Sequence, residues 1–212
     1  MIKLGIDIDD TITNTNSYLI ECAKEYDKLI GNKGFQDEDA YDFTEMFYWT
    51  LDDKKGFFNY VKENEKLMNV SLRKDFREVY DELIKMVKIY FISSRSEKSY
   101  KIPYNQTKKW LEDNHINYEK LYVGIKEKGI ICKENKIDLF IDDFINQCED
   151  AKKYGINAIL MTTDYNKSSD LKRFDNWHQI LEYIRKCENE KNKWHWRNIE
   201  KNPWLYFRRN NG

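Results

Sequence analysis

GIDIDDTIT, residues 5–13, is the stretch that decides the fold, because an apolar strand here runs directly into three acids. The acids are Asp7, Asp9 and Asp10. Burying so much negative charge at a strand end is unfavourable unless a cation or a proton offsets it. Side chains at positions i and i+2 of an extended segment project to the same face. Asp7 and Asp9 can therefore address one reacting group, one as a nucleophile and the other as an acid and base, although an acidic turn that closes a strand is the simpler alternative.

A second pair of acids, Asp142 and Asp143, follows the apolar run LFI. Two acidic strand ends that lie more than a hundred residues apart can meet only if their strands are near each other in one sheet. Carboxylates without interleaved histidine or cysteine favour a hard cation that keeps waters and meets a substrate phosphate. The two acidic segments together predict a magnesium site.

Hydroxyl and cationic side chains follow a third apolar run, in the segment YFISSR. Ser93 could donate a hydrogen bond to a phosphate oxygen, with the backbone N–H of Ser94 beside it and Arg95 next in the chain. Lys128 could neutralise both a phosphate and the carboxylates, and Lys126 competes with it for this role. A serine at a strand end is usually a turn residue, and an isolated lysine is usually solvated. The proposed roles therefore rest on where these residues stand relative to the predicted strands, and not on their residue types.

The spacing of apolar runs predicts an α/β fold. Five runs predict strands: Ile2–Ile8, Val87–Ser93, Leu121–Ile125, Asp138–Ile141 and Ala158–Thr163. Amphipathic segments predict helices at Tyr104–His115 and Phe144–Tyr154, and Gly155 is expected to cap the second. Strands that alternate with helices imply a parallel, Rossmann-type sheet with helices on both faces.

The interval between the first two strands is far longer than the others. We expect a helical cap over residues 16–75, folded over the carboxyl edge of the sheet, and a catalytic core formed by residues 1–15 and 76–190. Aromatic side chains in the cap are candidates for contacting a substrate, with packing inside the cap as the alternative. These residues are Phe43, Phe47, Tyr48 and Trp49.

The composition is that of a globular protein and does not indicate a nucleic-acid or membrane partner. Its 212 residues suit one domain plus an insertion, and 36 basic residues against 37 acidic ones do not point to nucleic acid or a membrane surface. No apolar run approaches the roughly 20 residues that span a bilayer, so we expect a cytoplasmic protein. Four cysteines without a CxxC pair are expected to be reduced packing thiols.

The last stretch, residues 191–212, has six basic residues, one acidic residue and five interleaved aromatic residues. It is expected to pack on the core or on a second subunit, which would make a homodimer. Binding of single-stranded nucleic acid is the less favoured alternative, because stacking rings between cations suit such a ligand.

Four segments in this order resemble the four motifs of the haloacid dehalogenase (HAD) superfamily of phosphatases: DIDDTIT, ISSR, the lysine of KEKGI, and FIDD. The resemblance implies that Asp7 attacks phosphorus to form an aspartyl-phosphate, and that Asp9 protonates the leaving oxygen and then activates water. It also implies magnesium as the cofactor. The remaining implied roles are phosphoryl binding by Ser93, Ser94 and Lys128, magnesium binding by Asp7, the backbone carbonyl of Asp9, and Asp142, and support by Thr11, Arg95 and Asp143.

The long insertion, the SSR ending and the acidic pair are similar to the 5′(3′)-deoxyribonucleotidase branch of that superfamily and its bacterial relatives. This resemblance implies a nucleoside monophosphate as substrate. A sugar phosphate, another small organic phosphate or a nucleic-acid end are alternatives, and a non-catalytic phosphate-binding regulatory protein is an alternative of another class. For Asp9 to carry a proton, we expect nearby negative charge and partial burial to raise its pKa.

Overall fold

The computed structural model describes residues 1–37, 40 and 42–188. The basic, aromatic stretch at residues 191–212 lies outside the described residues, so the expectations for it stay untested. Within the described part of the chain, no helix has both the length and the apolar character needed to cross a bilayer.

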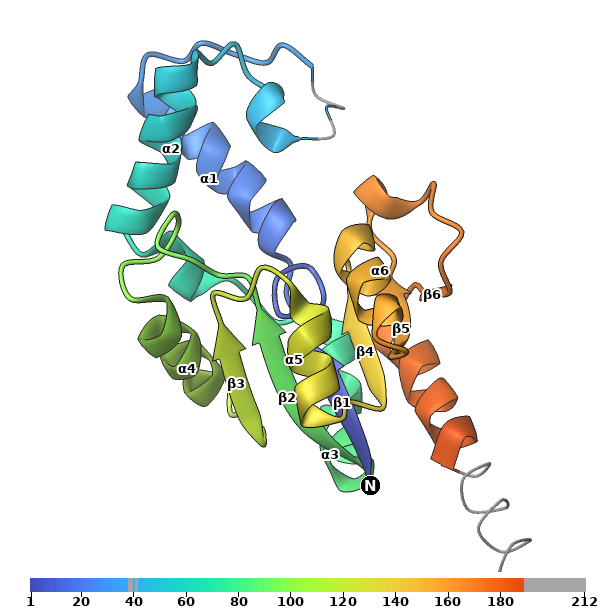
Figure 1. The fold of residues 1–212 in the computed structure, drawn as a ribbon. Helices are drawn as coiled ribbons and strands as arrows, with labels where there is room; N and C mark the ends of the chain where they lie inside the picture. Colours follow the sequence, from blue (N-terminus) through green and yellow to red (C-terminus); the bar gives the residue numbers. More distant parts are fainter. Residues whose placement is uncertain (38–39, 41, 189–212) are drawn as a thin grey trace, which may run out of the picture.

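A six-stranded parallel sheet forms the centre of the molecule, in the order β3-β2-β1-β4-β5-β6 (Figure 1). The strands are β1 (Ile2–Ile6), β2 (Val87–Ser93), β3 (Lys120–Val123), β4 (Leu139–Asp142), β5 (Asn157–Met161) and β6 (Arg173–Phe174). The predicted parallel α/β sheet is confirmed, and the five predicted strands overlap β1 to β5. The sixth strand has two residues, which is too short for an apolar pattern to reveal.

Helices cover both faces of the sheet. They are α3 (Lys74–Met86), α4 (Pro103–Asp113), α5 (Lys128–Asn135), α6 (Ile145–Lys153) and a helix that includes residues 177–188. Phe76, Trp110 and Trp177 join one hydrophobic cluster, whereas Cys132 and Cys148 join a second cluster. The predicted helices correspond to α4 and α6, whose bounds differ by one or two residues from those expected.

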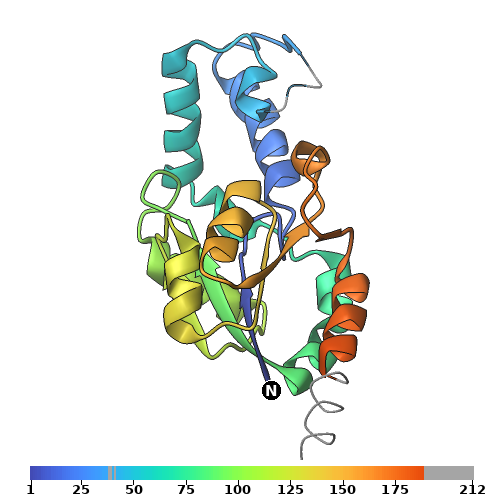
Figure 2. The same cartoon turned by 45° about the vertical axis from the view of Figure 1, so that its right-hand side comes forward.

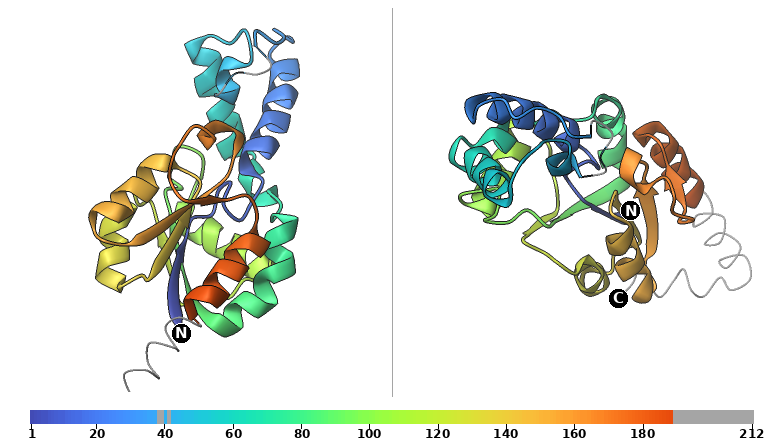
Figure 3. Two further views of the ribbon diagram at one scale, coloured as in Figure 1. Left: turned by 90° about the vertical axis from the view of Figure 1, so that its right-hand side faces the viewer. Right: turned by 90° about the horizontal axis from the view of Figure 1, so that it is seen from above.

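Strand β4 shows why both faces are apolar. Leu139 and Ile141 belong to the first cluster and Phe140 to the second, because side chains alternate across a strand. The helix at residues 177–188 lies beside α3, far from it in sequence (Figure 2 and Figure 3), and Arg185 Nη2 pairs with Glu82 Oε1 at 2.5 Å.

A helical cap rises from the carboxyl ends of the strands (Figure 1). It contains α1 (Thr15–Leu29), α2 (Leu51–Glu63) and two short 3-10 helices, η1 (Phe43–Glu45) and η2 (Lys66–Asn69). Helix α2 starts at a capping box in which Thr50 Oγ1 accepts from the backbone N–H of Asp53, and the Asp53 carboxylate accepts from the backbone N–H of Thr50. The cap boundary expected after residue 75 falls in the first turn of α3.

Strand β1 ends two residues earlier than predicted. The backbone N–H of Asp7 still donates to the Ile141 carbonyl at 2.9 Å, but the chain then turns, with Asp10 in the left-handed region at a φ of 54°. The predicted extent of the strand to Ile8 is therefore wrong, although Asp7 and Asp9 both line one cavity, as expected of two groups that act on one reacting group. Both acids lie in a loop over the carboxyl edge of the sheet.

Candidate active site

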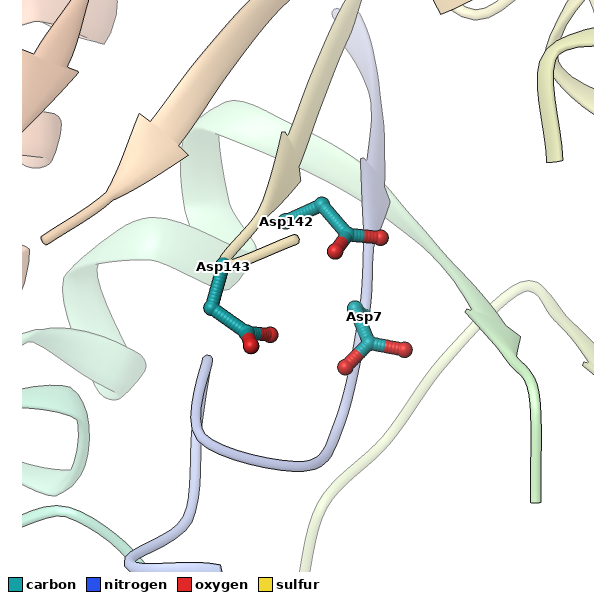
Figure 4. Close-up of side chains that lie close together, drawn as sticks. All are labelled: Asp7, Asp142 and Asp143. Atoms are coloured by element: carbon teal, nitrogen blue, oxygen red, sulfur yellow. The ribbon is translucent and has the colours of Figure 1, made fainter. Parts of the chain in front are cut away.

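The two acidic segments meet because their strands are neighbours. Strands β1 and β4 pair in parallel, with Ile6 opposite Ile141, so Asp7 and Asp142 leave the sheet at the same edge. Oxygen atoms of Asp7, Asp142 and Asp143 all lie within 4.8 Å of one another, and Figure 4 shows the three carboxylates converging. All three residues are buried.

This group fits a hard divalent cation, because it offers only oxygen ligands and concentrates negative charge that burial alone would make unfavourable. Asp143, expected only to support the site, lies with the other two acids. Its carboxylate accepts a 2.9 Å hydrogen bond from the Thr11 hydroxyl and another from the Tyr165 hydroxyl. Sequence reasoning missed Tyr165, whose side chain reaches the site from the η3 turn (Asp164–Asn166), where no motif marks it.

Lys128 places a positive charge between two of the three acids. Its ammonium donates to the carboxylate of Asp7 and, at 2.8 Å, to that of Asp142. The residue opens α5, and Gly129 beside it allows α5 to approach α6 closely, since a Cβ there would lie 2.6 Å from the carbonyl oxygen of Asp150. Lys128 is buried whereas Lys126 is exposed at the rim, so geometry favours Lys128 in their competition.

Burial controls the protonation of this centre. It raises the pKa of Asp7 to about 7, even though the nearby charge of Lys128 acts in the opposite direction. Burial also raises the pKa of Asp10 to about 6 and that of Asp143 well above its ordinary range. For Lys128, burial opposes the charged form, but Asp142 and Asp7 outweigh it and raise the pKa of the ammonium.

The pKa of Asp9 is lowered, whereas the sequence predicted that it would be raised. Partial burial acts to raise the pKa, but the charge and hydrogen bonds of Arg95, together with a hydrogen bond from Thr15, lower it below the ordinary value. Arg95 Nε and Nη2 donate to the two carboxylate oxygens at 2.9 and 2.8 Å. The sequence places Arg95 next to the serines but carries no sign that its side chain turns to Asp9.

The two serines after β2 lie at different depths. Ser93 is fully buried, and its hydroxyl accepts a 3.2 Å hydrogen bond from the backbone N–H of Arg95 while keeping its own proton for donation. Ser94 lies at the surface of the cavity described next, and its hydroxyl donates to the carbonyl of Ile125 at 2.8 Å.

A cavity of about 510 Å³ opens above the acids. Its wall includes Asp7, Asp9, Asp142, Asp143, Lys128, Arg95 and Tyr100 from the core, and Leu19 and Leu67 from the cap. Phe144, which is 46% exposed, lines it directly after the acidic pair. Sequence reasoning missed Leu19, Leu67, Tyr100 and Phe144, because single residues of these types are ordinary packing residues.

The four cap aromatics expected at the substrate are not in this wall. Phe47 and Trp49 stack on each other with ring centroids 4.6 Å apart, and Trp49 Nε1 donates to Asp27 at 2.7 Å. Phe43 packs against Phe57 in the same cluster, and Tyr48 is exposed elsewhere. The expectation is corrected: Phe43, Phe47 and Trp49 pack in the cap's own hydrophobic cluster, which is the alternative given above, and Tyr48 belongs neither to that cluster nor to the cavity wall.

A pH dependence of stability follows from the raised pKa of Asp7. The folded state keeps a proton between about pH 4 and pH 7 that the unfolded chain has lost, so the free energy of unfolding should fall as pH rises through this window. Urea denaturation in chelator should therefore show a less stable protein at pH 8 than at pH 5. Because a metal competes with that proton, added Mg²⁺ should raise the melting temperature more at pH 8. An Asp7→Asn variant that kept the full pH dependence would contradict this assignment.

The parallel sheet and the acids, lysine and hydroxyls at its carboxyl edge define a phosphatase of the HAD superfamily. Solved structures share the fold. A "Putative Phosphatase from Clostridium difficile" superposes with a TM-score of 0.65 at 13% identity, over 87% of this chain and 99% of that one. The "putative HAD-hydrolase YfnB from Bacillus subtilis bound to magnesium" has a TM-score of 0.61 at 12% identity, over 87% and 98% of the two chains.

Residues 1–189 match the model of the family described as "5' nucleotidase, deoxy (Pyrimidine), cytosolic type C protein", and the chain belongs to this family. "Putative nucleotidase YqfW" of Bacillus subtilis is 28% identical over 191 residues, which cover 87% of this chain and 94% of that protein. A "Putative nucleotidase" of Bacillus cereus is 26% identical, over 87% and 99% of the two chains. The predicted membership of the HAD superfamily is confirmed.

Proposed function

We propose that this protein is a magnesium-dependent phosphomonoester hydrolase that acts through an aspartyl-phosphate on Asp7, with 5′-(deoxy)nucleoside monophosphates as substrates. The observation that carries the proposal is the convergence of Asp7, Asp142, Asp143 and Lys128 on the floor of one cavity. Phosphoryl transfer needs alignment and charge neutralisation, and this floor supplies both. Residues 16–75 would act as the cap over it.

In the first half of the reaction, a carboxylate oxygen of Asp7 attacks phosphorus and the bond from phosphorus to the leaving oxygen breaks. Arg95 lowers the pKa of Asp9 in the free protein, so Asp9 has to gain a proton when the negatively charged phosphate binds beside it. Asp9 then gives this proton to the leaving oxygen, so a neutral alcohol departs. In the second half, Asp9 takes a proton from water as the water oxygen attacks phosphorus. The bond to Asp7 breaks, inorganic phosphate leaves, and both carboxyl groups return to their starting states.

Lys128, Ser93 and Ser94 are the groups proposed to hold the phosphoryl oxygens during both halves. Lys128 is a buried cation beside the nucleophile, so its charge acts at close range. A magnesium ion held by Asp7, Asp142 and the backbone carbonyl of Asp9, with Asp143 adjacent, would supply further charge neutralisation.

A phosphate-release screen tests the proposal. It compares 5′-nucleoside monophosphates, sugar phosphates and phosphorylated oligonucleotide ends, with and without Mg²⁺, against the Asp7→Asn variant as a blank. We expect magnesium-dependent release that is fastest with deoxynucleoside monophosphates. Equal or faster release from sugar phosphates would overturn the nucleotidase assignment, and no release above the blank would overturn the whole proposal.

Phe144 is the aromatic residue proposed to stack on the base. Of the two aromatic residues that the described part of the chain places in the cavity wall, Phe144 is about half exposed whereas Tyr100 is buried, and Phe144 directly follows the acids. Because stacking of a base on an aromatic ring is worth about 1–3 kcal/mol, Phe144→Ala should lower kcat/KM for nucleoside monophosphates about tenfold or more. The value for ribose 5-phosphate should hold, and Phe144→Tyr should behave as wild type. An equal loss on both substrates would show that Phe144 supports the acids instead.

A further inference from the structure

Arg95 and Lys128 are the two buried cations among the described residues at the cavity. Lys128 has a proposed role in phosphate binding, whereas Arg95 contacts a carboxylate of the protein. The Arg95 side chain is 1% exposed, and it directs two nitrogen atoms to a single carboxylate, that of Asp9. The distances are 2.9 Å from Nε to Oδ2 and 2.8 Å from Nη2 to Oδ1. A two-pronged contact of this kind fixes the plane of the carboxylate as well as its position.

Aromatic packing fixes the guanidinium in turn. Its central carbon lies 5.1 Å from the ring centroid of Tyr100 and 5.4 Å from that of Trp110. Trp110 is itself 1% exposed and is held by a 3.0 Å hydrogen bond from Nε1 to the carbonyl of Val70. Arg95 therefore has little freedom to turn away from Asp9.

The placement of Arg95 is not the best one for stability alone. Its Nη1 atom and the Tyr100 hydroxyl are both buried without a hydrogen-bond partner among the described residues. A buried donor that is left unpaired is destabilising. Such an arrangement is expected where a side chain is held for its effect on a neighbouring group.

A third donor, the hydroxyl of Thr15, also contacts the Asp9 carboxylate. The Thr15 hydroxyl donates to Asp9 Oδ1 at 2.8 Å, and Thr15 is the first residue of α1, where the cap begins. The Thr15 hydroxyl also lies 2.7 Å from that of Thr13. The Asp9 carboxylate is thus oriented both by the end of β2 and by the first turn of the cap.

We propose that Arg95 is a positioning residue: with Thr15, it holds the Asp9 carboxylate in the orientation from which this group exchanges protons with the leaving oxygen and with water. The inference rests on the proposed function, in which Asp9 is the acid and base. It assigns Arg95 to Asp9 and not to the substrate phosphate, and these two roles have different kinetic consequences.

The leaving group distinguishes the two roles. A nucleoside leaves as an alcohol and needs a proton, whereas 4-nitrophenolate leaves without one. The ratio kcat/KM covers the steps up to release of the leaving group, so the later attack by water does not enter it. We expect Arg95→Met to lower kcat/KM for a nucleoside monophosphate by about 100-fold, a typical contribution of acid catalysis, and for 4-nitrophenyl phosphate by less than about fivefold.

Three further measurements complete the test. The inhibition constant of inorganic phosphate should stay within about twofold of wild type if Arg95 does not bind the phosphoryl group. The double variant Asp9→Asn/Arg95→Met should be no slower than Asp9→Asn, because both changes remove one function. Thr15→Val removes a hydroxyl and no charge, and it should lower kcat/KM more for the nucleoside monophosphate than for 4-nitrophenyl phosphate, with a smaller difference than Arg95→Met. This variant keeps the inference testable if Arg95→Met does not fold.

Two results would overturn the inference while leaving the proposed function intact. One is an equal loss of kcat/KM on both substrates, and the other is a loss of phosphate affinity that matches the loss of kcat/KM. Failure of the proposed function looks different, since Asp7→Asn would then be as active as wild type on every substrate.

Discussion

Asp7→Asn is expected to reduce phosphate release by at least about three orders of magnitude while the protein stays folded. The amide has the shape of the carboxylate but is a far poorer nucleophile, so the covalent step is lost. Because burial already disfavours the charged form of Asp7, removal of this charge should not lower the melting temperature in the absence of metal. Release of phosphate and thermal melting, measured side by side, check both statements.

The matched control is Asp81→Asn on the exposed side of α3, where the carboxylate pairs with Arg77 at 3.2 Å. It makes the same chemical change far from the cavity, so activity and melting temperature should both stay near wild type. If Asp7→Asn kept more than about a tenth of the activity in the presence of Mg²⁺, another residue would have to be the nucleophile.

Lys128→Met is expected to destabilise the metal-free protein by about 3 kcal/mol or more at pH 8. The ammonium is buried between Asp7 and Asp142, and methionine fills a similar volume without its charge. Two buried carboxylates would then face each other without a cation. Urea denaturation in chelator measures the loss, and added Mg²⁺ should recover part of it because the ion restores positive charge at the same acids.

Lys126→Met provides the matched control, since Lys126 lies two residues away and is exposed. Its effect on the free energy of unfolding should be within about 0.5 kcal/mol. Activity of Lys128→Met should be lost even at saturating Mg²⁺, because the metal does not replace the lysine at the phosphoryl oxygens. Equal effects of the two variants on stability would mean that the buried ion pairs do not hold the site together.

The sheet and its acidic edge could be predicted because parallel strands that are buried on both faces have nearly continuous apolar sequences. Each run ends in its functional residue, as β1 does before Asp7 and β4 does at Asp142. Neighbouring parallel strands then bring these residues to one edge, so a local pattern was enough to predict a site formed over a long sequence separation.

Contacts that depend on the direction of a single side chain could not be predicted. Arg95 and Asp9 are 86 residues apart, and nothing in the order of residues shows that one turns to the other. The prediction for the pKa of Asp9 failed for this reason, since it included the nearby acids and omitted the arginine. Trp49 was likewise a candidate for the cavity wall until its partner Asp27, 22 residues away, was known.

The separate hydrophobic cluster of the cap affects how substrate preference can evolve. Leu67 belongs to that cluster and Leu19 packs against it, yet both also line the cavity. A mutation that reshapes the cavity from the cap side therefore also disturbs the packing that keeps the cap folded. Phe144 is half exposed, and its backbone N–H, not its ring, contacts the Asp142 carboxylate at 2.8 Å. Selection for a new substrate meets a weaker stability constraint at this position than at Leu19 or Leu67, so divergence in specificity should begin there before it reaches the cap.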